Sequence, residues 1–298
     1  MSKKWGAAQT AAARSRALLT ELDAVRTSPG VTNVHQTRVA CRRLGQSLSV
    51  LRPHLPPKLH KRARLATKAV RKYFGPCRDA DVLLERLHLW LATHPPDHAG
   101  ATAAAELVAR LAAERRKHTR RLLRRLRTKG AKTHAREIYA LFTWCSENRV
   151  RAKSKKASAP PASGAADVQT SSGRLRAMLA EQPLDTSAEG LRHAHEVRIV
   201  VKACRYGVES LSENPEDVEP FKAQQDALGA VQDNCVLLTL IDDAIDRTPK
   251  RPKPGLEHLS QRSGLSALRT DILGGIGAHF VAFHAAHHRG NKLLARLL

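Results

Sequence analysis

Two segments of the chain share one spacing of basic side chains. Residues 35–48 read HQTRVACRRLGQSL, and residues 195–208 read HEVRIVVKACRYGV. In both segments a His is followed by an Arg after three residues and by an Arg or Lys after seven. At ~100° per residue of an α-helix, offsets of 0, 3, 7 and 10 fall within an arc of roughly 80°. Each segment is therefore predicted to form a helix that carries one row of cations, which we call a ladder.

Each ladder lies beside an apolar stripe, so one side of each helix is expected to pack into a helix bundle. The first ladder comprises His35, Arg38 and Arg42 with Arg43 beside them, and the second comprises His195, Arg198, Lys202 and Arg205 with Tyr206 beside them.

The chemistry of the ladders points to phosphate. Guanidinium and ammonium groups bind phosphate oxygens through charge-assisted hydrogen bonds, and an Arg can make two at once. A row that spans ~15 Å is longer than one phosphate and suits a linear polymer with regularly spaced charges. A helix face that is merely solvated would favour an acidic residue four positions from each cation. The ladders carry almost none, since Glu196 lies off the stripe.

The repeat continues beyond the ladders. Residues 74–84 read FGPCRDADVLL and residues 228–238 read LGAVQDNCVLL, which aligns Gly75 with Gly229. A second basic row leads into each of these segments, and it is weaker in the second half. The row consists of Lys61, Arg64, Lys68, Arg71 and Arg78 in the first half and of Lys222 in the second.

Three acidic residues belong to the repeat. Asp79 and Asp233 occupy matched positions after the glycines, and we interpret both as helix N-caps. Asp81 is a candidate salt-bridge partner for an Arg of the first ladder, a role that could not recur in the second half because Cys235 stands at the matching position.

Apolar residues recur with the helical period along most of the chain, whereas strand-like alternation is rare, so we expect an all-α fold. Residues 152–173, rich in Ala, Ser, Pro and Lys, are predicted to be a disordered linker between a helical part at 1–151 and another at 174–298. Helices are predicted at 5–26, 32–53, 57–74, 78–93, 98–128, 132–149, 174–181, 187–212, 215–230, 232–246, 256–270 and 272–297.

Composition restricts the class of protein. The 298 residues include 51 Lys and Arg against 27 Asp and Glu, a formal charge of +24, which implies a polyanionic partner. The five cysteines form no CxxC pair and are expected to be reduced core thiols. The chain shows neither the apolar run of a signal peptide nor the ~18 uncharged apolar residues of a membrane span. We expect a cytoplasmic protein without membrane insertion.

Four segments in order, HQTRVACRRL, GPCRDADVLL, HEVRIVVKACRYGVESL and LGAVQDNCVLL, resemble the CHAD domain, the conserved histidine α-helical domain. The resemblance implies two pseudo-symmetric four-helix bundles around a basic central cavity or groove that binds inorganic polyphosphate. It also implies an association with polyphosphate granules, with granule proteins as further candidate partners. Gly45 and Ala203 stand where the family usually has basic residues. The resemblance assigns polyphosphate contacts to both ladders and, in the second basic row, to Lys68, Arg71, Arg78 and Lys222. Lys61 and Arg64 are added to these candidates because they share the helical spacing of that row.

Other functions have weaker support in the sequence. No P-loop, GxSxG or HExxH motif occurs, so we expect a binding protein without catalytic residues or cofactors. His284, His287 and His288 lack nearby Cys or carboxylate ligands, and we predict no metal site there. The main alternative is a histone-like protein that binds nucleic acid without sequence preference. The basic segment 110–129 would either extend a polyanion-binding surface or form a solvated face.

Overall fold

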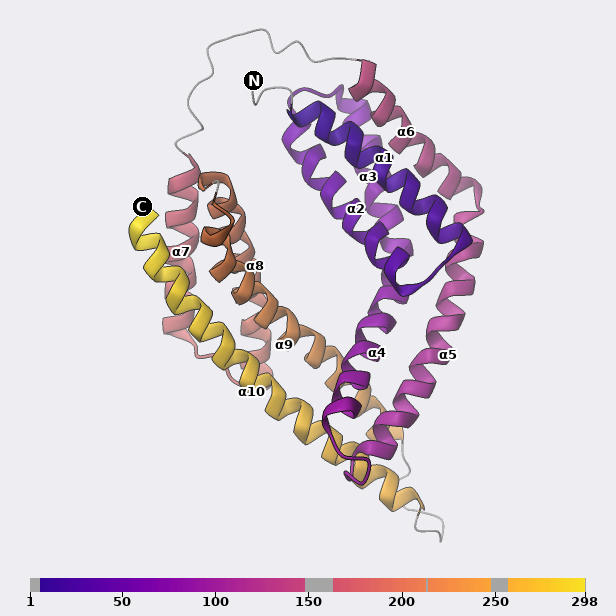
Figure 1. The fold of residues 1–298 in the computed structure, drawn as a ribbon, viewed down its shortest axis with the longest axis vertical. Helices are drawn as coiled ribbons and strands as arrows, with labels where there is room; N and C mark the ends of the chain where they lie inside the picture. The colour runs from indigo at the N-terminus through magenta and orange to yellow at the C-terminus, as the bar shows by residue number, and fades with distance from the viewer. Residues whose placement is uncertain (1–5, 148–162, 213, 248–256, 298) are drawn as a thin grey trace. The chain divides into compact units, whose positions relative to one another are not determined.

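Helices form all the regular secondary structure in the computed structural model, which describes residues 6–147, 163–212, 214–247 and 257–297 (Figure 1). Within these ranges there are ten helices and no strand, which confirms the all-α class. The helices are α1 (Gly6–Thr27), α2 (Val31–Leu51), α3 (Pro57–Tyr73), α4 (Gly75–Thr93), α5 (Ala101–Leu126), α6 (Lys129–Glu147), α7 (Ser163–Glu181), α8 (Ala188–Leu211), α9 (Pro215–Arg247) and α10 (Glu257–Leu297).

Two pairs of predicted helices are each one continuous helix. The segments expected at 215–230 and 232–246 form α9, and those expected at 256–270 and 272–297 form α10. The first split was expected because Gly229 matches Gly75, where a helix does begin. Gly229 instead lies inside α9, and no glycine among the described residues has a positive φ. Buried Leu228 and Val231 beside it hold the helix in the core, which outweighs the ~1 kcal/mol that Gly costs in a helix.

The predicted linker was too long. Its residues 163–173 are the first turns of α7, while 152–162 lie outside the described residues, as do residues 248–255 between the helices predicted at 232–246 and 256–270. Val168 of α7 is fully buried, and its Cγ2 atom lies so close to Gly207 of α8 that a Cβ atom there would clash with it. One apolar contact therefore orders a segment whose composition is typical of linkers.

The chain divides into two compact units. Unit 1 consists of residues 1–85 and 108–156, and unit 2 of residues 86–107 and 157–298. Helices α4 and α5 therefore each contribute to both units, whereas the sequence analysis had placed residues 86–107 in the first part. In unit 2 this hairpin packs on α10. The amide Nε2 of Gln261 donates a 2.8 Å hydrogen bond to Glu106, and Gly100 closely approaches the backbone at Leu268.

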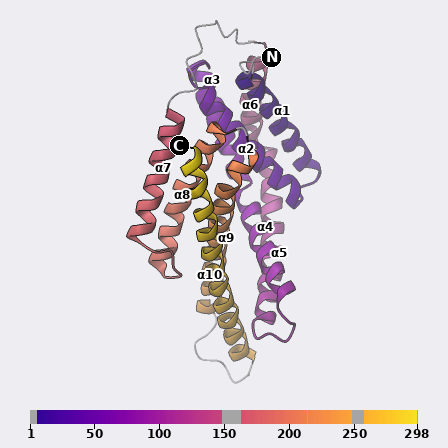
Figure 2. The same cartoon turned by 60° about the vertical axis from the view of Figure 1, so that its left-hand side comes forward.

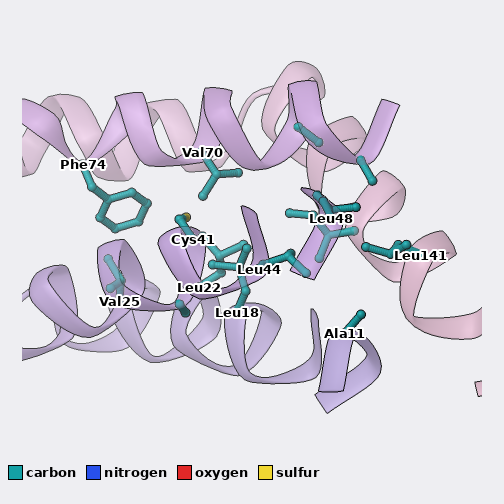
Figure 3. Close-up of a cluster of buried hydrophobic side chains, with 14 of the residues drawn as sticks. Ala11, Leu18, Leu22, Val25, Cys41, Leu44, Leu48, Val70, Phe74 and Leu141 are labelled. Atoms are coloured by element: carbon teal, nitrogen blue, oxygen red, sulfur yellow. The ribbon is translucent and has the colours of Figure 1, made fainter. Parts of the chain in front are cut away.

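Unit 1 is built on α1, α2, α3 and α6 (Figure 1). Figure 3 shows Cys41 and Leu44 of α2 between Leu18 of α1 and Val70 of α3, and all four side chains are buried. The apolar stripe beside the first ladder thus faces this core, as predicted. Burial of a side chain the size of Leu contributes about 1.5–3 kcal/mol, so these contacts set the rotation of α2 about its axis. That rotation leaves the ladder at the edge of the core.

Unit 2 is likewise built from helices that pack through buried apolar side chains, here α7, α8, α9 and α10. Of these, α9 and α10 run side by side (Figure 2). The predicted stripe beside the second ladder is buried, including Val197, Val201 and Cys204 of α8. Gly290 permits the close approach of α10 to α9, because a Cβ atom there would lie 2.8 Å from Nε2 of buried Gln224.

The cysteines are free thiols, and four of the five are buried. Burial raises the pKa of the Cys41 thiol to about 12 and those of Cys145 and Cys204 to about 11. Such thiols stay protonated and behave as small apolar side chains. Among the described residues, no helix has the length and apolar character needed to cross a membrane.

Candidate functional site

The first ladder emerges from the edge of the unit 1 core. His35 and Arg38 are half-buried, whereas Arg42 and Arg43 are exposed. Nη1 of Arg38 donates a hydrogen bond to the backbone carbonyl of Arg71, at 3.3 Å, where α3 ends. The same nitrogen lies 3.8 Å from the position that a Cβ atom would take at Gly75, where α4 begins. Arg38 therefore links the ladder of α2 to the junction between α3 and α4.

His35 lies in a strongly cationic environment. Burial lowers the pKa of His35, the positive charges of Arg78 and Arg42 lower it further, Glu85 opposes them, and Arg38 lowers it by the smallest amount. These cations belong to both α2 and α4, so the structure brings Arg78 close to the first ladder. His35 is neutral at pH 7 and can take up a proton when an anion offsets the surrounding charges.

The second basic row of unit 1 follows α3. Its four members on this helix are exposed, and the opposite side of α3, with Ala63, Ala66 and Val70, is buried. The backbone carbonyl of Arg71 accepts the hydrogen bond from Arg38 and so joins this row to the ladder. Arg78 is half-buried and lies 4.0 Å from Glu85 in a long ion pair. The C-terminal end of the second basic row therefore lies beside the first ladder.

The second ladder repeats the key contact of the first. Nη2 of Arg198 lies 3.6 Å from the position of a Cβ atom at Gly229. Nδ1 of His195 donates a 2.8 Å hydrogen bond to Oε1 of Gln232, which lies three residues after Gly229 as Arg78 lies three residues after Gly75. The matched glycines therefore lie under matched arginines, and each ladder histidine is influenced by the residue three positions after its glycine, Arg78 on α4 or Gln232 on α9.

The remaining members of the second ladder are more engaged with the protein itself. Arg205 forms a 3.0 Å ion pair with Glu209, and its guanidinium carbon lies 5.2 Å from the ring centre of the exposed Tyr206. Outside the ladder, Lys222 of the second basic row lies 3.4 Å from Glu219. Lys202 is half-buried. Carboxylates thus offset part of the charge of this ladder, which the spacing of the basic residues did not reveal.

The acidic residues of the repeat have other roles than those predicted. Asp79 and Asp233 are not N-caps, because α4 already begins at Gly75 and Asp233 lies within α9. Asp79 lies near Arg38 and Arg78, and its pKa is raised by burial against the opposing effect of those charges. Asp233 lies 3.8 Å from Arg86.

Asp81 does not pair with a ladder Arg. Its Oδ1 atom accepts a 2.9 Å hydrogen bond from Nε of Arg115 on α5, and Asp81 is only 4% exposed. The prediction was wrong because Asp81 faces the α4–α5 contact, and the sequence spacing within α4 could not show which helix packs there.

A pocket beside His195 was not predicted from the sequence. This cavity of about 720 Å³ is lined by α8, α9 and α10, and it includes Arg192 and Arg269. Oδ1 of Asp242 accepts a 2.6 Å hydrogen bond from Arg269. Arg192 could have been found from the sequence, because it lies three residues before His195 and extends the second ladder by one turn.

The histidines near the C-terminus form part of the packing of α10. The ring of His287 stacks on Phe283 with 5.9 Å between centroids, and Asn291 lies within hydrogen-bonding distance of its Nε2 atom. Over the described parts of the chain, no group of three His, Cys, Asp or Glu side chains is arranged to hold a metal ion.

Comparisons with known proteins agree with the architecture. A model of the CHAD domain matches residues 9–242, and a comparison with curated proteins gave no match. Among solved structures, PptA from Streptomyces chartreusis superposes with a TM-score of 0.66 at 20% identity, over 94% of this chain and 97% of that one. The CHAD domain of the plant Ricinus communis superposes with a TM-score of 0.62 at 20% identity, over 94% and 90%. At this identity the two structures show a common fold. Because the CHAD model covers well over half of the chain, the protein belongs to the CHAD-domain family.

Proposed function

We propose that the protein binds inorganic polyphosphate through its two ladders. The observation that carries the proposal is the repeated placement of a guanidinium group over a glycine, Arg38 at Gly75 and Arg198 at Gly229. Each of these arginines lies in a row of cations that is longer than one phosphate group. A polymer with a charge on every phosphate can contact such a row at several positions at once. Membership of the CHAD-domain family supports the same ligand.

The proposed contacts use both units. In unit 1 they are His35, Arg38, Arg42, Arg43, Arg71 and Arg78, with Lys61, Arg64 and Lys68 along α3, and in unit 2 they are His195, Arg198, Lys202, Arg205, Tyr206 and Lys222. We propose that the units are pseudo-symmetric helical bundles whose ladders form one basic groove and contact the same polymer chain. Joint binding would raise the affinity for long chains above that for short ones, because the second ladder binds intramolecularly.

We also propose that the protein binds polyphosphate without cleaving it. The ladders supply cations, whereas hydrolysis of a phosphoanhydride needs a positioned nucleophile with metal ions or an acid–base pair. A binding protein of this kind would serve to organise polyphosphate granules in the cytoplasm or to direct partner proteins to them.

The test is a titration of labelled long-chain polyphosphate at near-physiological salt. We expect the double variant Arg38→Gln/Arg198→Gln to lose at least tenfold in affinity. The matched control is Arg26→Gln/Arg247→Gln, which removes the same charge from exposed surface ion pairs in the two units. Equal affinities of the two double variants would refute the ladder site and leave only general basicity. Release of orthophosphate by the wild-type protein with Mg²⁺ present would refute the absence of catalysis.

A further inference from the structure

A basic surface on α5 lies apart from both ladders. Its side chains line a groove of about 630 Å³ on unit 1, and none of them is acidic. We call this surface the α5 face; it consists of Lys117, Arg120, Arg121, Leu123, Arg124 and Arg127. The five cations lie at offsets of 0, 3, 4, 7 and 10, so they form a band ~15 Å long on one side of the helix.

The α5 face has a fixed orientation. Leu122 and Leu126 on the opposite side of α5 belong to the buried core of unit 1. One turn before the face, Arg115 is bonded to buried Asp81 and to the backbone carbonyl of Pro29. Arg125 lies 4.9 Å from the ring centre of Tyr73 on α3. These contacts prevent α5 from rotating, so its exposed cations are held toward solvent.

No carboxylate compensates this charge. The sequence contains no Asp or Glu between Glu114 and Glu137. In the part of the chain that the structure describes, no ion pair is formed by any of the five cations of the α5 face. Like charges at i, i+3 and i+4 destabilise a helix, and here nothing in the described structure offsets this cost. A ligand with dense negative charge would offset it.

The shape of the α5 face favours a wide polyanion. All five cations are exposed, whereas the arginine that lies over the glycine in each ladder site, Arg38 or Arg198, is half-buried. A duplex is too wide to reach half-buried side chains, but an exposed α-helix of ~10–12 Å fits the major groove of B-DNA, which is ~12 Å wide.

We propose that the α5 face binds the phosphate backbone of duplex DNA without sequence preference. Residues 115–128 include no Asn or Gln that could read adenine and no Phe, Tyr or Trp on which a base could stack. The affinity therefore comes from phosphate contacts and the release of counterions. This binding is separate from the proposed polyphosphate site, because the α5 face shares no residue with either ladder.

The test is the salt dependence of binding to a short fluorescent DNA duplex. Five phosphate contacts predict a slope of about −4.5 for log K against log salt. The variant Arg120→Gln/Arg121→Gln/Arg124→Gln should reduce this slope by about 2.7, since each lost contact removes about 0.9. Glutamine is a good helix former and these positions are exposed, so α5 should remain folded. The corresponding triple Arg→Lys variant keeps the charge and should retain the wild-type slope.

A matched control separates the two sites. The variant Arg38→Gln/Lys68→Gln/Arg198→Gln removes three charges from the ladder sites and should leave the DNA slope unchanged. The α5 triple variant should in turn retain its affinity for polyphosphate. The inference is overturned if both triple variants weaken DNA binding equally, if the α5 variant binds DNA like the wild type, or if single-stranded DNA binds more tightly than the duplex. It is also overturned if the α5 variant loses as much polyphosphate affinity as the ladder variant.

Discussion

The guanidinium group of Arg38 lies 3.8 Å from the position that a Cβ atom would occupy at Gly75, and Arg198 has the same relationship to Gly229 at 3.6 Å. The two glycines differ in local structure, since Gly75 begins α4 and Gly229 lies inside α9. What they share is the arginine above them. The missing side chain keeps the space beside each guanidinium open, where a phosphate oxygen can approach.

Substitutions at Gly229 should separate stability from binding. Gly229→Ala places its Cβ atom at an ordinary contact distance from Arg198 and should stabilise α9 by up to ~1 kcal/mol in a urea titration. Gly229→Leu should fill the space beside the guanidinium and weaken polyphosphate binding. The control is Gly274→Leu on α10, which is exposed and has no neighbour within 4 Å of the added Cβ atom. Equal polyphosphate affinities of the two Leu variants would contradict the proposed role of the open space.

Polyphosphate binding should be coupled to proton uptake by His35. The pKa of His35 is lowered by burial and then by Arg78 and Arg42. A bound polyanion offsets those positive charges and raises the pKa of His35, so the complex takes up a proton. Affinity should therefore increase as the pH falls through the raised pKa of the complex toward the lowered pKa of the free protein, by at most tenfold per pH unit for one proton.

Calorimetry in two buffers with different ionisation enthalpies measures this proton uptake directly. His35→Gln should show less uptake and a flatter pH profile than the wild type. His54→Gln, at an exposed position that follows α2, is the matched control and should keep the wild-type profile. The same uptake in His35→Gln as in the wild type would show that another group takes the proton.

Removal of Glu209 should strengthen polyphosphate binding. Its carboxylate pairs with Arg205 at 3.0 Å and competes with the polymer for this guanidinium. An exposed ion pair is worth about 0.2–1 kcal/mol, so Glu209→Gln should increase affinity about 1.4- to 5-fold. Asp243→Asn removes the same charge from another ion pair of unit 2, with Arg247, and should have a smaller effect. If both variants gain equally, net charge alone accounts for the increase.

The ion pair between Asp81 and Arg115 should be important for the stability of unit 1. Asp81→Ala leaves the mostly buried Arg115 without its carboxylate and should lower the free energy of unfolding by about 3–5 kcal/mol. Asp81→Leu/Arg115→Met should recover most of this loss, because it removes both charges. Asp79→Ala, at an exposed position two residues earlier, should cost less than about 1 kcal/mol. Urea unfolding of these variants decides between a stabilising pair and a dispensable one.

Much of the fold follows from local sequence patterns. The first six helices begin and end within three residues of their predicted limits, because the 3.6-residue apolar period and the prolines that bound it are local signals. The two wrong helix predictions also came from local signals. Gly229 suggested a break by analogy with Gly75, and the composition of 163–173 suggested disorder. In both segments buried neighbours, such as Val168, decided the conformation.

The candidate site was likewise predictable only in part from local sequence patterns. The sequence by itself determined that His35, Arg38 and Arg42 share a stripe, and that His195, Arg198 and Lys202 repeat it, because the angular position of a residue on a helix depends only on its number. Which side chains meet across helices depends on how those helices pack, and no local spacing encodes that. Only the tertiary structure could place Arg38 over Gly75, join Asp81 to Arg115 and bring residues 86–107 into unit 2.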